Sequence, residues 1–150
     1  MHLGNYLRLL QVAEENLASA FREVAEGHAD EADVRVIGTR LAAQCESHAH
    51  RLEPFARRYS EESEEPERLH SNLFGGVRGG GLGLLRDLHD LYLMACECDI
   101  VWTLVGQGAQ GARDTELLEI THGCEPETAT QMQWLRTRMK QAAPQALVVA

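Results

Sequence analysis

Apolar residues near the N-terminus recur at alternating steps of four and three positions. They are Leu3, Leu7, Leu10, Leu17, Phe21 and Val24. This spacing predicts an α-helix over residues 3–26 with one apolar side that faces a core. Glu14 occupies a position of the same series. Because a carboxylate buried alone costs several kcal/mol, we expect Glu14 to be paired, protonated or bound to another group.

A second apolar series contains polar residues in the same way. Ile37, Leu41, Leu52 and Phe55 share one helical side with Gln44 and His48. The pattern predicts a helix over residues 30–59, with acidic residues in its first turn. Since only a short polar turn separates the two helices, we expect them to be antiparallel neighbours. Glu14 and His48 are then expected to meet in the interior.

Residues 60–81 differ from the segments on either side. An acidic stretch around Pro66 is followed by a run rich in glycine. We interpret this segment as a connector, although a loop of this length is uncommon in a compact domain. At about 3.3 Å per residue it can run along the whole length of a helical bundle of about 40 Å. Such a crossover allows the helices before and after it to run parallel.

The third helix is predicted over residues 82–108 and is apolar on most of its circumference. Such a helix is typically central or covered by a partner. Its polar residues form a stripe at steps of three and four, namely His89, Tyr92, Cys96, Asp99 and Thr103. We expect this stripe to face the bundle interior, because apolar residues flank it on both sides.

The fourth helix is predicted over residues 113–143. Its inward side is expected to carry Leu117, Cys124, Thr128 and Leu135, with Gln131 beside them. Pro126 lies within this stretch and lacks a backbone donor, so we expect a kink or a restart there. Each of the four helices therefore brings a polar or thiol group toward the bundle axis.

Carboxylates and imidazoles that face each other inside a four-helix bundle are typical of di-iron and di-manganese sites. With a short first loop, a long second connector and a short third loop, the chain resembles the ferritin-like superfamily. The resemblance implies an all-α four-helix bundle that comprises residues 1–150 as one domain. In it, the second and third helices run parallel. An up-down-up-down bundle is the alternative.

The resemblance also implies a set of metal ligands. Ferritin-like sites use a Glu on the first and third helices and Glu-x-x-His on the second and fourth. Glu14 matches the first helix and His48 the histidine of the second, while Cys45 stands where that helix would have its Glu. The implied ligands of iron, manganese or zinc are Glu14, His48 and Asp99, with Gln44, His89, Tyr92 and Cys96 in support. A metal-free interior is the alternative.

Composition limits the classes of partner and location. The formal charge of −9 argues against nucleic acid as the main partner, because phosphate contacts need a basic surface. No run of 18 or more apolar residues predicts a membrane span, and the N-terminus does not have the pattern of a signal peptide. The four cysteines lack the Cys-x-x-Cys spacing, so we expect reduced thiols and a cytoplasmic protein.

Two classes of function remain open from the sequence. One is a metal-binding or redox bundle; the other is a non-enzymatic bundle that binds a partner or small ligand, with buried polar groups that only fix the helix register. The sequence assigns no substrate or reaction, so it leaves open whether the protein is an enzyme. Apolar residues beyond the inward side of the third helix (Met94, Val101 and Val105) and an apolar tail predict a homodimer.

Overall fold

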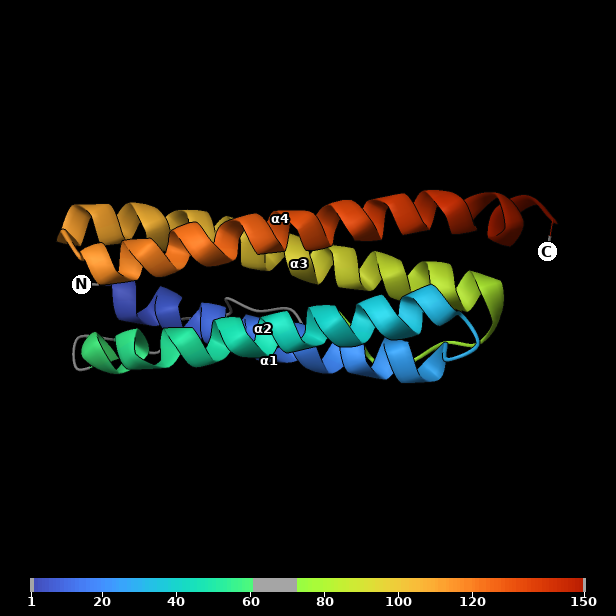
Figure 1. The fold of residues 1–150 in the computed structure, drawn as a ribbon, viewed down its shortest axis with the longest axis horizontal. Helices are drawn as coiled ribbons and strands as arrows, with labels where there is room; N and C mark the ends of the chain where they lie inside the picture. The colour runs from blue at the N-terminus through green and yellow to red at the C-terminus, as the bar shows by residue number, and fades with distance from the viewer. Residues whose placement is uncertain (1, 61–72, 150) are drawn as a thin grey trace.

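The computed structural model describes residues 2–60 and 73–149, which form an all-α four-helix bundle, as predicted (Figure 1). The helices are α1 (Leu3–Gly27), α2 (Ala32–Arg58), α3 (Gly80–Ala112) and α4 (Thr115–Pro144), and a π-helical segment, η2 (Gln145–Val149), extends α4. No helix in this part of the chain is long and apolar enough to cross a membrane. The predicted connector includes residues 61–72, which lie outside the described residues.

Contacts between the helix ends establish the direction of each helix. The C-terminal end of α2 meets the start of α4, where Arg58 Nη1 lies 2.8 Å from Asp114 Oδ2. The first turns of α3 lie beside the turn between α1 and α2, where His28 Nε2 lies 2.8 Å from Asp87 Oδ2. Thus α2 and α3 run parallel, and α4 returns antiparallel to α3 (Figure 1). This is the predicted helix order, so the up-down-up-down alternative is wrong.

The inward sides of α1 and α4 are those predicted from their spacing. On α1, the buried residues include Leu7, Leu10, Glu14, Leu17, Phe21 and Val24. On α4, they include Leu117, Cys124, Thr128, Gln131 and Leu135. Burial of these stripes supplies the main driving force for packing the helices together.

The prediction for the inward side of α3 was wrong. His89 and Thr103 are exposed, while Tyr92, Cys96 and Asp99 are only half-buried. The buried line instead consists of Leu84, Leu88, Leu91, Ala95, Cys98, Trp102 and Val105. Because apolar residues surround most of this helix, several rotations about its axis bury a similar apolar area, and the hydrophobic pattern alone does not distinguish them.

The turn between α3 and α4 is set by local backbone chemistry. Arg113 has a left-handed backbone with φ of 56°, which ends α3 four residues later than predicted. Asp114 then caps α4, since its Oδ1 accepts a hydrogen bond of 3.1 Å from the Leu117 amide. Of the kink or restart predicted at Pro126, the restart is wrong, because α4 is continuous from Thr115 to Pro144. Packing on both sides of the proline outweighs its missing donor.

Candidate functional site

Glu14 and His48 meet in the interior, as predicted. The Oε1 atom of Glu14 lies 3.1 Å from Nδ1 of His48, and the two residues are 0% and 1% exposed. Trp102 on α3 donates from Nε1 to the same carboxylate oxygen at 2.8 Å. Three helices therefore converge on one buried carboxylate, whose Oε1 atom has two hydrogen-bonding neighbours, while its Oε2 atom is buried and has no hydrogen-bond partner among the described residues.

The fourth helix completes a polar layer across the bundle. Gln131 on α4 donates from Nε2 to Oε1 of Gln44 on α2 at 3.0 Å. Its own Oε1 accepts a hydrogen bond of 3.6 Å from the Cys45 thiol. Gln44, which was predicted in a supporting role, thus belongs to this layer. The layer contains groups from all four helices and fixes how they are aligned along the axis.

The electrostatic state of His48 depends on its neighbours. Burial away from water opposes the positive charge and by itself lowers the pKa of His48. The neighbouring Cys124 and Glu14 side chains outweigh burial and raise the pKa of His48 from its ordinary value of 6.5 to about 10. His48 is therefore protonated at neutral pH, and the Glu14–His48 contact is an ion pair.

This ion pair predicts a loss of stability in alkaline solution. The pKa of His48 is about 10 in the folded chain and 6.5 without these neighbours. The pair therefore stabilises the fold fully below pH 6.5, and its contribution declines as the pH rises to about 10. We expect the free energy of unfolding in urea to fall between pH 7 and pH 10, with the His48 imidazole still protonated at pH 8 by NMR. A neutral His48 at pH 8 would contradict the ion pair.

The other predicted ligand and supporting residues lie on a different side of α3. Asp99 is half-buried; burial and the nearby charge of Glu125 on α4 raise the pKa of its carboxyl. Tyr92 contacts the guanidinium of Arg136, which lies 5.4 Å from the centre of its ring. With His89 exposed and Cys96 half-buried, these four residues line the outer edge of the contact between α3 and α4 and do not join Glu14 and His48.

The residues around Glu14 and His48 do not fit a two-metal centre. In the part of the chain that the structure describes, no three His, Cys, Asp or Glu side chains are grouped so that they could hold a metal ion. The inward positions near the pair carry Cys45, Trp102 and Gln131 instead of carboxylates. Trp102 also donates to one of the two oxygens of the Glu14 carboxylate. Binding of iron, manganese or zinc by Glu14, His48 and Asp99 therefore has no support from this geometry.

No protein-family model matches the sequence, and no curated protein or solved structure is similar to it. The function therefore has to be argued from the residues themselves. The likeness to the ferritin-like superfamily remains one of helix layout, because no relative links this chain to that superfamily.

A second buried polar cluster was not found from the sequence. Asp87 on α3 is 0% exposed and contacts His28 from the turn between α1 and α2. Its carboxylate also accepts hydrogen bonds from the backbone amide and the guanidinium of Arg78, at 3.0 Å and 2.7 Å. The signal available in the sequence was Asp87 itself, an acid between apolar positions of the third helix. Its partner His28 lies 59 positions away, and Arg78 lies before the start of α3, so helical spacing reveals neither contact.

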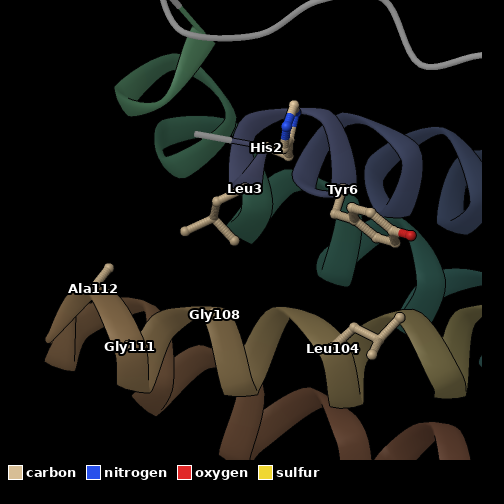
Figure 2. A pocket seen from close by; sticks show the side chains of 7 residues that line it. All are labelled: His2, Leu3, Tyr6, Leu104, Gly108, Gly111 and Ala112. Atoms are coloured by element: carbon tan, nitrogen blue, oxygen red, sulfur yellow. The ribbon is translucent and has the colours of Figure 1, made fainter.

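An apolar pocket lies on the surface between the start of α1 and the end of α3 (Figure 2). Its volume is about 530 Å³, within the range of ligand and side-chain pockets. Leu3 and Tyr6 extend from α1 toward α3, and Leu104 extends from α3 toward α1 (Figure 2). The α3 side is formed largely by Gly108 and Gly111, which have no side chains to fill the space. The pocket is thus a second candidate site, suited to an apolar group.

Proposed function

We propose that this protein is a non-enzymatic, ferritin-like helical bundle without a two-metal centre, and that it works by binding a partner helix along α3. The occupant that we propose is α3 of a second copy, which makes the protein a homodimer. The observation that carries the proposal is an exposed apolar stripe on α3 that leads into the pocket of Figure 2. The buried polar layer then has the structural role of aligning the four helices. A cytoplasmic location remains a prediction.

The stripe is unusual because three large apolar residues on one side of α3 face solvent. Leu93, Ile100 and Leu104 are 40%, 54% and 46% exposed. Their steps of seven and four residues keep them on one helical side, and Gly108 and Gly111 continue the same line. The line from Leu93 to Gly111 is about 27 Å long at about 1.5 Å per residue. An exposed apolar line of this kind is typical of helix-in-groove recognition.

The stripe is complementary to itself when a second copy is placed antiparallel. A two-fold axis at the level of Trp102 puts Leu93 of each copy opposite Gly111 of the other. The same axis puts Ile100 opposite Leu104. At each end of this pairing a large residue faces a small one, because Leu93 lies against Gly111 and enters the pocket of the partner, and at its centre Ile100 packs against Leu104. This match of large and small residues supports a second copy over an unrelated helix.

The apolar residues of α3 that predicted a homodimer do not lie on its surface. Met94, Val101 and Val105, which were expected beyond the inward side of α3, are buried within the chain itself. The exposed large apolar residues of α3 are those of the stripe described above and Leu82 near the start of the helix. The tail residues Leu147, Val148 and Val149 are exposed and lie beyond the end of α4, where Leu147 lines a separate pocket with residues of α3 and α4.

The proposal predicts a particle of about 33 kDa, twice the mass of the 16.7 kDa chain, by light scattering after gel filtration. Leu93→Asp is expected to raise the dimer dissociation constant about 100-fold, because it places a carboxylate where the proposed dimer would bury the leucine side chain. Val36→Asp is the matched control, since Val36 is a similarly exposed residue of α2 outside the stripe. A wild-type monomer, or equal effects of both variants, would overturn the proposal.

A second variant separates loss of the dimer from loss of the fold. A Cβ atom added at Gly111 meets no heavy atom within 4 Å in the single chain, so Gly111→Leu begins in open space there. It also removes the helix penalty of glycine, about 1 kcal/mol, so the subunit should be at least as stable. In the proposed dimer, however, the new leucine occupies the space that the partner's apolar side chain needs. We therefore expect a stable Gly111→Leu monomer; an unchanged dimer would contradict this pairing.

A further inference from the structure

Cys124 lies between two basic side chains in the polar layer. Nη1 of Arg51 lies 3.4 Å from Sγ of Cys124 and points a guanidinium hydrogen toward it. His48 is the other neighbour, and the interaction between Cys124 and His48 helps to keep that imidazole protonated. The sequence showed no such partners, because Arg51 and Cys124 are separated by 73 positions.

The arrangement around His48 has the order carboxylate, imidazole, thiol. Glu14 holds Nδ1 of His48 on one side. On the other side, Nε2 is buried and has no hydrogen-bond partner among residues 2–60 and 73–149. It lies 3.5 Å from Oε1 of Glu127, one turn along α4 from Cys124. A buried nitrogen left open in this way is available to a group that binds or reacts beside Cys124.

We propose that Cys124 is a reactive thiol that small hydroperoxides oxidise to a sulfenic acid, with Arg51 and His48 as its activating partners. Thiolates, rather than thiols, react with peroxides, and positively charged neighbours stabilise them. Glu14 acts here as a positioning residue, because it fixes the orientation and the protonation of His48.

Access to Cys124 limits the reagent to a small molecule. Cys124 has no exposed surface; Arg51 lies next to it, and Glu127 lies next to its neighbour His48. Arg51 is half-buried and crosses over Gly123, where an added Cβ would lie 3.1 Å from Nη2 of Arg51. Glu127, beside His48, is 40% exposed at its side chain. The proposal requires that rotation of one of these side chains opens a path for a molecule of the size of hydrogen peroxide.

The proposed step is a two-electron oxidation of sulfur. The Cys124 thiolate attacks the terminal oxygen of the hydroperoxide, so an S–O bond forms and the O–O bond breaks. The leaving alkoxide, or hydroxide when the reagent is hydrogen peroxide, takes the proton of His48 and departs as an alcohol or water. Sulfur is oxidised to sulfenic acid and the peroxide is reduced, so the atoms and electrons balance.

The other cysteines lack these neighbours. Burial raises the pKa of the Cys45 and Cys98 thiols well above the ordinary value, and the charge of Glu14 raises both further. Burial also raises the pKa of the Cys96 thiol, which is half-buried and the most accessible of the four. Selective oxidation of Cys124 over the more accessible Cys96 is therefore evidence of activation and not of exposure.

The experiment treats the folded full chain with hydrogen peroxide in the presence of dimedone and locates the sulfenic acid adduct by mass spectrometry. We expect the adduct at Cys124, loss of labelling in Cys124→Ser, and wild-type labelling in Cys96→Ser. Labelling at Cys96 instead, or no labelling of the folded chain, would overturn the proposal.

The role of Arg51 is tested by charge. Arg51→Gln is expected to slow labelling of Cys124 about tenfold, because it removes a charge-assisted hydrogen bond. Arg51→Lys is expected to keep most of the rate. Arg57→Gln makes the same charge change at an exposed position of α2 and is the matched control. If Arg51 only covers the thiol, Arg51→Gln speeds labelling by opening the site, and that result rejects activation.

Discussion

A Glu14→Leu variant is expected to lose about 3–5 kcal/mol of unfolding free energy, measured by urea denaturation at pH 7. The reason is that His48 remains in the interior without its carboxylate partner, so it must either keep an unpaired buried charge or give up its proton. Trp102 also loses the acceptor for its indole N–H, which has a bond of 2.8 Å in the wild type. The stability lost on removing one member of a buried pair exceeds the net stability that the intact pair adds. The reason is that the remaining polar group stays buried, with neither its partner nor water to bind.

The double variant Glu14→Leu with His48→Leu is expected to recover most of this loss, because it leaves no buried charge unpaired. Glu15→Leu is the control, since Glu15 is the exposed neighbour of Glu14 on α1 and surface changes stay within about 0.5 kcal/mol. If the losses of the two single variants simply add in the double variant, Glu14 and His48 do not act as a pair. The polar layer would then have to be explained through its other members.

Glu14 and His48 were predictable because α1 and α2 have narrow apolar stripes. In such a helix the polar residues that fall within the stripe have only one side to face, so burial follows from spacing alone. A short turn also makes the two helices antiparallel neighbours, which brings the two stripes together. The contact between Glu14 and His48 therefore follows from the sequences of α1 and α2 alone, without reference to α3 or α4.

The partners from α3 and α4 were not predictable in the same way. The apolar surface of α3 surrounds most of the helix, so its pattern permitted an inward Asp99 when the structure places Trp102 there. Arg51 reaches Cys124 from another helix, and nothing in their spacing brings them together. Such contacts depend on how helices rotate and align after packing, and residue order along one helix does not contain that information.

Asp87→Leu is expected to cost about 3–5 kcal/mol of unfolding free energy, although no sequence pattern marked Asp87 as important. The variant leaves buried His28 and the guanidinium of Arg78 without their shared carboxylate. It also frees the Arg78 amide, which Asp87 ties to the first turns of α3. We therefore expect faster hydrogen exchange at that amide in addition to the loss measured in urea.

Asp90→Leu provides the comparison for Asp87→Leu. Asp90 contacts the same guanidinium at 2.9 Å, but its side chain is 17% exposed and that of Arg78 is 34% exposed. Water can replace this second carboxylate, so the expected loss is about 1 kcal/mol or less. Equal losses of unfolding free energy in the two variants would mean that only the contacts with Arg78 stabilise the fold and that the Asp87–His28 contact adds nothing. A larger loss for Asp87→Leu assigns the difference to the buried link between α3 and the α1–α2 turn.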